Sequence, residues 1–184
     1  MKKAVLIILS LALVLAVLSG CASNNSPNNS QIGGNSKRTI NGSLKSFNAS
    51  TLGGGSFSNS DFAKYDLTVI NFWGTYCGPC INEMPELAKF KNGLPSNINF
   101  ITYCVDAQNN ENTVKSILGE AGLSATVIIA ADGDFSSVLK QIQYIPTTLF
   151  IDSEGNIVGT EIIGGVSNLE ETYNAHVDEA LSQS

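Results

Sequence analysis

The chain has 184 residues, of which 43% are hydrophobic, and a formal net charge of −6. Two of its ten basic residues, Lys2 and Lys3, precede an apolar N-terminal stretch, so eight basic residues stand against sixteen acidic ones in the remainder. That excess of carboxylates argues against binding to nucleic acid and against electrostatic attachment to anionic lipid.

The first 21 residues predict a bacterial lipoprotein signal peptide. The apolar run Ala4–Leu18 follows two lysines and is shorter than a typical membrane span. It leads into Leu18-Ser-Gly-Cys21, which resembles the lipobox of bacterial lipoproteins, so we expect Cys21 to carry lipid and to become the mature N-terminus. The alternatives are a retained membrane helix and ordinary cleavage near Ala22, which would release a soluble protein.

Residues 22–40 predict a flexible tether, because the stretch Ala22–Lys37 is rich in Asn, Ser and Gly and cannot bury enough apolar area to fold. About 16 residues of such coil span on the order of 20–25 Å. We therefore expect residues 41–184 to form one domain, held by lipid on the outer face of a bacterial cell membrane.

The domain is predicted to begin with a β-hairpin formed by Ser43–Leu52 and Ser56–Phe62, with a triple glycine between them. Thr68–Phe72 is apolar and predicts a buried strand. The stretch from Gly78 to about Lys91 has apolar residues at helical spacing and predicts a helix. Pro85 lies inside this helix and should kink it, since proline lacks the backbone donor.

A second buried strand is expected at Ile98–Val105. The next helix is expected to begin at Glu111 or the residue before it, because apolar residues then recur at i, i+3, i+4 and i+7. Thr126–Ala130 is strand-like, and Asp134 is a plausible N-cap for a short helix that ends at Gln141.

The last third of the domain predicts two strands, Thr147–Ile151 and Asn156–Ile163, joined by a turn sequence. Ser167 and Glu170 have the spacing of a capping box at the start of a final helix. Strands that alternate with helices in this way indicate an α/β fold, with a mixed central sheet covered by helices on both faces.

Cys77 and Cys80 are separated by two residues at the junction of a predicted strand and a predicted helix. A helix N-terminus presents unpaired N–H groups and partial positive charge, which favour a thiolate. Lowering a cysteine pKa from about 8.5 to about 7 corresponds to about 2 kcal/mol, which a helix terminus and one hydrogen bond can supply. The pattern indicates a dithiol–disulfide exchange site that needs no cofactor and no metal.

Cys104 and His176 are not expected to take part in the reaction or to bind a metal. Cys104 lies in a strand-like apolar stretch, so we interpret it as a small buried hydrophobe, with a regulatory thiol as the alternative. Half of a zinc site is also conceivable for the cysteine pair, but only Cys104 and His176 remain as further ligands and neither has ligand-like spacing. We therefore predict no metal site, and we expect His176 to be a surface or partly buried histidine.

The chain resembles the TlpA/ResA-like group of membrane-anchored thiol–disulfide oxidoreductases, which have a thioredoxin fold. The resemblance covers about Ser43–Leu181 and is carried by Val69–Pro85, Tyr144–Thr148 and Asp152–Ile157. It implies an N-terminal β-hairpin and an inserted helix–strand segment at about Asn110–Gly133.

The resemblance also implies roles for single residues. Cys77 would be the attacking nucleophile and Cys80 the resolving thiol, and Pro146 would follow a cis peptide bond that faces the disulfide. Glu83 matches an acidic residue typical of the group and would handle a proton, while Asn71 stands where cytoplasmic thioredoxins have a buried Asp. The alternatives are a solvated first-turn acid for Glu83 and a trans turn proline for Pro146.

A partner protein is expected to contact the residues around the disulfide. Tyr76 departs from the family's usual Trp, and Gly78-Pro79 is the dipeptide of reducing thioredoxins. Trp73 has packing beside the site as its alternative role. The expected contact residues are Trp73, Tyr76, Gly78, Pro79, Ile145 and Thr147.

The resemblance implies an extracytoplasmic, monomeric reductase of a protein disulfide, such as apocytochrome c before haem attachment or a surface methionine sulfoxide reductase with an antioxidant role. Electrons would come from a membrane dithiol carrier of the CcdA/DsbD-like type. The alternatives are a disulfide-forming oxidase on the same scaffold and a copper-binding metallochaperone. A peroxidase is disfavoured, because Thr75 lies two residues before Cys77, where a Thr-x-x-Cys arrangement would be expected.

Overall fold

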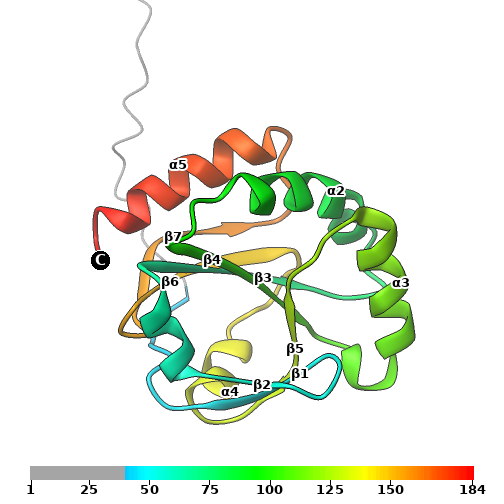
Figure 1. The fold of residues 1–184 in the computed structure, drawn as a ribbon, viewed down its shortest axis with the longest axis horizontal. Coiled ribbons are helices and arrows are strands. Elements are labelled where there is room, and N and C mark those ends of the chain that lie inside the picture. The colour runs from blue at the N-terminus through cyan, green and yellow to red at the C-terminus, as the bar shows by residue number, and fades with distance from the viewer. Residues whose placement is uncertain (1–39) are drawn as a thin grey trace, which may run out of the picture. The chain divides into compact units, whose positions relative to one another are not determined.

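The computed structural model describes residues 40–184 (Figure 1). The predicted signal peptide, the lipidation of Cys21 and all but the last residue of the predicted tether lie outside the described residues. None of the helices in this described part of the chain is long and apolar enough to cross a bilayer.

Seven strands form one mixed sheet in the order β2-β1-β5-β4-β3-β6-β7. The central strand β3 pairs parallel with β4 and antiparallel with β6, and all seven of its residues are buried. The strands are β1 (Asn48–Thr51), β2 (Ser56–Ser58), β3 (Leu67–Trp73), β4 (Ile98–Cys104), β5 (Thr126–Ala131), β6 (Thr147–Asp152) and β7 (Ile157–Ile163).

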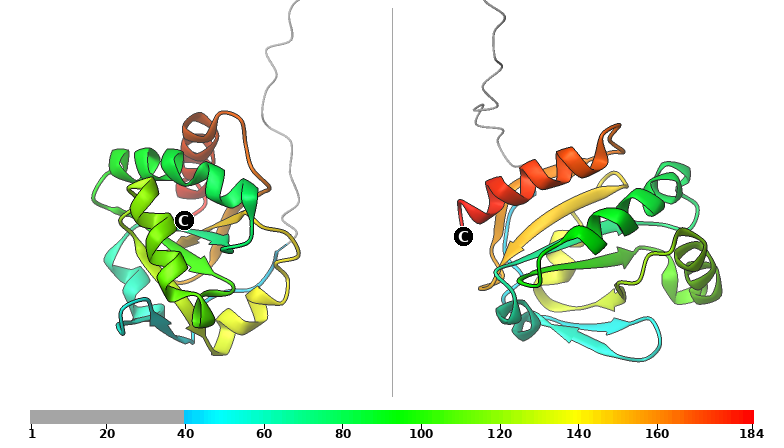
Figure 2. Two further views of the ribbon diagram at one scale, coloured as in Figure 1. Left: turned by 90° about the vertical axis from the view of Figure 1, so that its right-hand side faces the viewer. Right: turned by 45° about the horizontal axis from the view of Figure 1, so that its top comes forward.

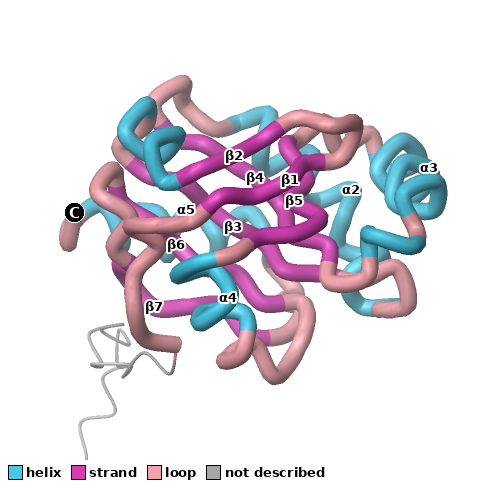
Figure 3. Tube along the Cα trace, turned by 90° about the horizontal axis from the view of Figure 1, so that it is seen from below, coloured by secondary structure: helices cyan, strands magenta, loops and turns pink. Residues whose placement is uncertain are grey.

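Helices cover both faces of this sheet, as predicted. Helices α2, α3 and α5 bury their apolar residues on one face, while α4 and the 3₁₀ helix η1 pack on the other (Figures 1 and 3). Figure 2 shows α2 and α5 side by side above the strands. The helices are η1 (Asn59–Lys64), α2 (Gly78–Gly93), η2 (Ala107–Asn109), α3 (Glu111–Ala121), α4 (Gly133–Leu139) and α5 (Leu169–Leu181).

The predicted α/β thioredoxin fold is therefore confirmed. The N-terminal hairpin is present as β1 and β2, and the inserted helix and strand are α3 and β5, with β5 between β1 and β4. Helix α2 begins after a short loop, residues 74–77, that follows β3, and it continues through Pro85 as one helix. The end of β3 and the N-terminus of α2 thus place Cys77 and Cys80 beyond the C-terminal end of the central strand.

The second hairpin strand is shorter than predicted. It ends at Ser58, and the next residues form η1 because Asp61 accepts the backbone N–H of Ser58 at 2.8 Å and turns the chain. Phe62 on η1 is then buried beneath the sheet.

The predicted N-cap at Asp134 is wrong. Helix α4 begins at Gly133, with Asp132 at the N-cap position. Asp134 lies inside the first turn, where its carboxylate accepts the backbone N–H groups of Lys45 (3.0 Å) and Ser46 (2.9 Å). A tertiary contact with the segment before β1 therefore occupies the side chain that was expected to cap the helix.

The predicted capping box of Ser167 and Glu170 is also wrong. Asn168 precedes the helix, and no side chain caps it. A start at Leu169 buries that leucine and places Glu170 and Glu171 in the first turn. The helix dipole stabilises carboxylates at that position without a side-chain cap.

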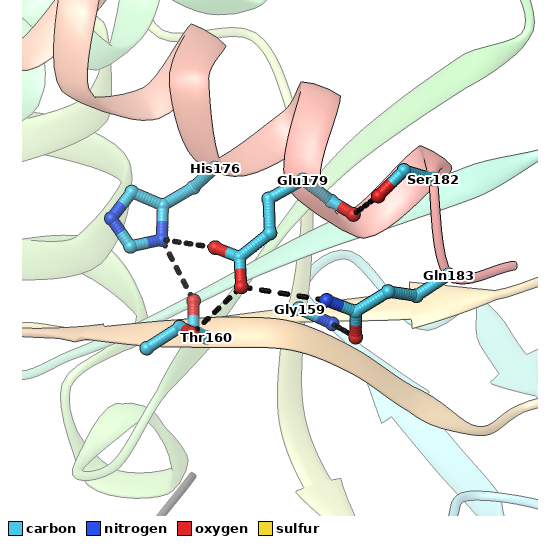
Figure 4. Close-up of polar contacts among 6 residues, drawn as sticks. All are labelled: Gly159, Thr160, His176, Glu179, Ser182 and Gln183. Carbon is cyan, nitrogen blue, oxygen red and sulfur yellow. Dashed lines mark hydrogen bonds and ion pairs between the residues drawn. The ribbon is translucent and has the colours of Figure 1, made fainter. Parts of the chain in front are cut away.

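Polar side chains attach the C-terminal end of α5 to β7 (Figure 4). Nδ1 of His176 donates to the carbonyl oxygen of Thr160 at 2.8 Å, and Glu179 accepts from the Thr160 hydroxyl at 2.9 Å. Gln183 accepts the backbone N–H of Gly159 at 3.0 Å. We call these five residues the C-terminal polar cluster.

Candidate functional site

A disulfide joins Cys77 to Cys80 at the junction of β3 and α2, with the two Cα atoms 5.2 Å apart. Cys77 occupies the N-cap position of α2 and is 7% exposed, whereas Cys80 lies in the first turn and is completely buried. The neighbours Tyr76, Gly78 and Pro79 are exposed. Only the first sulfur is therefore within reach of a partner molecule.

The start of α2 is arranged to stabilise negative charge on Cys77. The backbone N–H of Cys80 points at the Cys77 sulfur, with the nitrogen 3.2 Å from Sγ. The same N–H group and the helix dipole would stabilise a thiolate after reduction, because charge-assisted hydrogen bonds are stronger than neutral ones. This is the physical setting in which cysteine pKa values fall.

The segment before Pro146 lies opposite this sulfur. The Ile145–Pro146 peptide bond is cis, as predicted, and the carbonyl oxygen of Ile145 lies 3.6 Å from Cys77 Sγ. Tyr144 beside it is 68% exposed. The peptide groups next to the cis bond therefore face the reactive sulfur.

Two of the predicted contact residues cannot serve that role with their side chains. Trp73 is completely buried, so its packing role is the correct interpretation. Thr147 is also buried, and its hydroxyl donates to the carbonyl oxygen of Tyr144 at 2.8 Å. Both side chains support the loops around the disulfide from within the core.

Gly74 lies where three side chains converge. A Cβ atom at this position would come within 3.1–3.2 Å of Tyr76, Val105 and Ile145. Because such contacts are tighter than ordinary packing allows, glycine lets the loop before Cys77 lie directly against the loop before Pro146.

Asp106, two residues after β4, anchors the loop before Cys77. This role was not predicted from the sequence. The Asp106 carboxylate accepts the backbone N–H of Thr75 at 2.9 Å and also the Thr75 hydroxyl. Asn110 Nδ2 adds a third bond at 3.2 Å. Burial opposes ionisation of Asp106, but the hydrogen bonds from Thr75 outweigh it and lower the pKa of the carboxyl.

Glu83 lies in the second turn of α2 and is 92% buried, since only 8% of its surface is exposed. Its carboxylate accepts a hydrogen bond from Asn71 Nδ2 on β3, at 3.2 Å. Burial raises the pKa of Glu83 to about 7, although the Asn71 bond acts in the opposite direction. The alternative of a solvated first-turn acid is therefore wrong.

A hollow of about 760 Å³ opens beside Glu83, between α2 and the segment that leads into α5. Pro79 of the cysteine motif lines one end of it, so the hollow connects the carboxyl group with the disulfide region and with water. Its remaining charged lining is acidic: Glu86, Glu170 and Glu171. Since Glu83 follows Cys80 by three residues, both side chains lie on one side of α2.

A family model described as Redoxin matches residues 39–175. The chain belongs to the Redoxin family.

Relatives of the chain agree with the predicted resemblance to the ResA-like group. The thiol-disulfide oxidoreductase ResA of Halalkalibacterium halodurans is 31% identical over 105 residues, covering 56% of this chain and 58% of that protein. The sporulation thiol-disulfide oxidoreductase A of Bacillus subtilis is 26% identical over 97 residues, covering 52% and 58%. The chain thus spans a little more than half of the length of the curated relatives that it matches.

Solved structures show the same fold. A thiol:disulfide interchange protein of the thioredoxin family from Chlorobium tepidum has a TM-score of 0.59 at 25% identity, covering 76% of this chain and 95% of that one. The match extends over most of the domain that carries the disulfide.

The third cysteine of the Redoxin domain is buried, as predicted. Cys104 on β4 is completely inaccessible, and burial raises the pKa of its thiol to about 12. Its Sγ lies 3.3 Å from Asp106, to which the thiol donates. The thiol is therefore protonated at neutral pH and packs as a small apolar group.

The chemistry available to the site follows from these neighbours. Within residues 40–184, no three His, Cys, Asp or Glu side chains gather as metal ligands would. The site instead brings together a reachable sulfur, a buried sulfur and a carboxyl group that exchanges protons near neutral pH. Those groups suit dithiol–disulfide exchange.

Proposed function

We propose that this protein is an extracytoplasmic thiol–disulfide oxidoreductase that reduces a disulfide in a partner protein. The observation that carries the proposal is the asymmetry of the pair. Cys77 is reachable at a helix N-terminus and accepts a backbone N–H, while Cys80 is sealed behind it. One sulfur can attack a partner, and the other can only attack the first.

The reaction begins with the reduced pair. The Cys77 thiolate attacks one sulfur of the partner disulfide, a mixed disulfide forms, and the partner's other sulfur leaves as a thiolate that takes up a proton. Cys80 then loses its proton and attacks the Cys77 sulfur. The partner leaves with both sulfurs reduced, and Cys77–Cys80 is oxidised by the same two electrons.

Glu83 accepts the proton of Cys80, through water in the adjoining hollow. A carboxyl group whose pKa is about 7 is half ionised at neutral pH, so it can both take and return a proton. Because Cys80 is completely buried, its ionisation needs such a base close by.

The partner would dock on the exposed side of the motif. Tyr76, Gly78 and Pro79 are accessible, and the peptide groups around Ile145 face the reactive sulfur. An extended partner chain pairing with that backbone would keep the sulfurs aligned.

The same proposal includes the cellular location, the substrate and the electron donor. Residues 1–21 would act as a lipoprotein signal, Cys21 would carry lipid, and 22–40 would tether the monomeric domain 41–184 to the membrane. The two relatives described above, both named thiol-disulfide oxidoreductases, support the activity. Apocytochrome c or a surface methionine sulfoxide reductase would be the substrate, and a CcdA/DsbD-like dithiol carrier the donor.

Trapping in the native host tests the proposal. Cys80→Ser cannot resolve the mixed disulfide, so we expect it to accumulate covalent complexes that dithiothreitol releases and mass spectrometry identifies. Cys77→Ser is the matched control and should capture nothing. Equal capture by the two variants would overturn the proposal.

The direction of electron flow needs its own measurement. The alternative, an oxidase that installs disulfides, uses the same geometry. A reduction potential near −270 mV or lower supports the reductase, whereas a potential near −120 mV would support the oxidase.

A further inference from the structure

Behind Glu83 lies a chain of polar side chains that the proposed reaction does not yet use. Asn71 on β3 is completely buried. Its Nδ2 lies 3.2 Å from Glu83 Oε1, 3.1 Å from the hydroxyl of Thr148 and 3.5 Å from the hydroxyl of Tyr173. The Thr148 and Tyr173 oxygens are 2.7 Å apart. We call these four residues the buried polar cluster.

The amide of Asn71 is satisfied at only one of its two ends. Nδ2 donates its two hydrogens to Glu83 and Thr148, its nearest oxygens, whereas Oδ1 is buried and has no hydrogen-bond partner in the described structure. This orientation suits an ionised Glu83, because a carboxylate accepts hydrogen bonds. A protonated Glu83 has an O–H to donate, and the amide nitrogen cannot accept it.

We propose that the Asn71 amide turns over when Glu83 gains or loses its proton, and that the Thr148 and Tyr173 hydroxyls support whichever orientation is present. A half-turn about the Cβ–Cγ bond exchanges the two ends of the amide. Oδ1 then accepts from the Glu83 O–H and from the Thr148 hydroxyl. Each orientation has two amide hydrogen bonds and one unpaired amide atom, so the turn costs little.

The two hydroxyls make this exchange possible because each can donate or accept. With Nδ2 toward Thr148, the Thr148 oxygen accepts from the amide and its own proton goes to Tyr173. With Oδ1 toward Thr148, that proton goes to the amide, and Tyr173 donates to Thr148. Only the Glu83 proton enters or leaves, and the hydroxyl protons rotate in place.

Tyr173 is therefore a positioning residue for Glu83, and this inference rests on the proposed function of Glu83 as the base for Cys80. Without its hydroxyl, the proton of Thr148 has no acceptor in the orientation that serves ionised Glu83. Both orientations keep a Thr148–amide bond, but in the one that serves protonated Glu83 the Thr148 proton is donated to the amide and no donor is left unpaired. Loss of the hydroxyl should thus favour protonated Glu83.

The charged side chains that line the hollow beside Glu83 are all acidic, so none of them offsets the effect of burial on its pKa. The two strands that pack beside it, β3 and β6, contribute the neutral side chains of Asn71 and Thr148. Glu86 is paired with Lys89 at 2.7 Å. The titratable groups that face Glu83 or its hollow are Cys80 and Glu86 on α2, and Glu170, Glu171 and Tyr173 on α5.

Carboxyl-carbon NMR of the full-length, reduced protein in detergent tests the inference directly. We expect Tyr173→Phe to raise the titration midpoint of Glu83 by about half a pH unit to one unit, and Asn71→Leu by one unit or more. The matched control is Tyr103→Phe, because Tyr103 is buried among aromatic rings on the opposite face of the sheet. It should leave the midpoint unchanged.

The side-chain amide signals of Asn71 provide the second readout. In the wild type, they should change with pH at the same midpoint as Glu83. A Tyr173→Phe midpoint equal to that of Tyr103→Phe, or Asn71 signals that ignore the titration, would overturn the inference. If Asn71→Leu does not fold, the wild-type signals and Tyr173→Phe still decide.

The titration needs no partner protein, so it separates two kinds of failure. A Cys80→Ser variant that traps nothing beyond its control would remove the proposed function and leave the amide turn intact. A normal trapping result with an unmoved midpoint would remove only the amide turn.

Discussion

Helix α5 contributes to two polar clusters whose carboxylates differ in burial and in the number of hydrogen bonds that they accept. The buried polar cluster contains Glu83, which is 92% buried and accepts a hydrogen bond from Asn71. In the C-terminal polar cluster, the Glu179 side chain is 39% exposed and accepts from Thr160 and Gln183 (Figure 4). Both contain a carboxylate held by neutral donors.

The difference distinguishes a carboxylate that holds two elements together, Glu179, from one whose pKa is shifted, Glu83. Water shares the solvation of Glu179, so its bonds fasten the end of α5 to β7 and do little else. Glu83 has exchanged water for one amide, which does not compensate fully for burial, and its pKa rises to about 7. Burial is therefore the main cause that brings the pKa of the Glu83 carboxyl group near neutrality.

The largest expected effect breaks the buried polar cluster at its acid. Glu83→Gln keeps the size and the hydrogen bond from Asn71 but cannot accept the proton of Cys80. We expect the resolving step to slow by about 100-fold at pH 7, within the usual range for losing a general base. Stopped-flow release of partner from a preformed mixed disulfide measures it.

Glu179→Gln is the control for that experiment, because it changes the same residue type on α5 outside the site. Its rate should equal that of the wild type. Similar slowing in both variants would mean that the carboxyl groups support the fold and not the reaction.

The next effect concerns stability and pH. The pKa of Glu83 rises from 4.5 when unfolded to about 7 when folded, so the folded chain binds more protons between those values. The free energy of unfolding should therefore fall as the pH rises through this window, by roughly 2–3 kcal/mol. Urea unfolding of the oxidised protein at pH 5 and pH 8 measures the change.

Glu83→Gln should lack this particular decline, since its side chain does not titrate. The unfolding free energy of the variant minus that of the wild type should thus increase from pH 5 to pH 8. Parallel pH curves for the two proteins would contradict the assignment of a raised pKa to this carboxyl.

A smaller effect is expected at the loop before Cys77. Asp106→Ala leaves the Thr75 N–H and hydroxyl without their carboxylate and should lower the free energy of unfolding by about 2 kcal/mol. Denaturant titration measures it, with Asp66→Ala as a control for an acid that the structure bonds only to Asn97 in an exposed contact. Equal losses would show that Asp106 is no special anchor.

The smallest effect belongs to the C-terminal polar cluster. Glu179→Ala should lower the free energy of unfolding by about 1 kcal/mol, because its hydrogen bonds are partly exposed. The rate of disulfide exchange should stay within twofold of the wild type. A larger loss of exchange would mean that the two ends of α5 are coupled, and the contrast between the clusters would fail.

The local part of the site could be predicted from the sequence. Cys77, Cys80 and Glu83 lie within seven consecutive positions, and the helix that carries them has clear apolar periodicity. The cis bond at Pro146 followed from the resemblance and is present. In each case, the determining signal is contained in a short stretch of chain.

The remainder depends on contacts between distant segments. Thr148 and Tyr173 reach Asn71 from 77 and 102 residues along the chain, and Asp106 reaches Thr75 from 31. Asp134 is another example, because its carboxylate accepts backbone N–H groups of Lys45 and Ser46 from a distant segment and does not cap the helix. Local patterns carry no information about such partners.

The bare backbone at Gly74 has a mechanical consequence. Tyr76, Val105 and Ile145 close over it, and Ile145 also carries the carbonyl that faces the Cys77 sulfur. The two loops that border the sulfur are thus in direct contact, and neither can move toward the other without a clash. The spacing of these loops depends on a hydrogen atom at the position where any other amino acid would place a carbon.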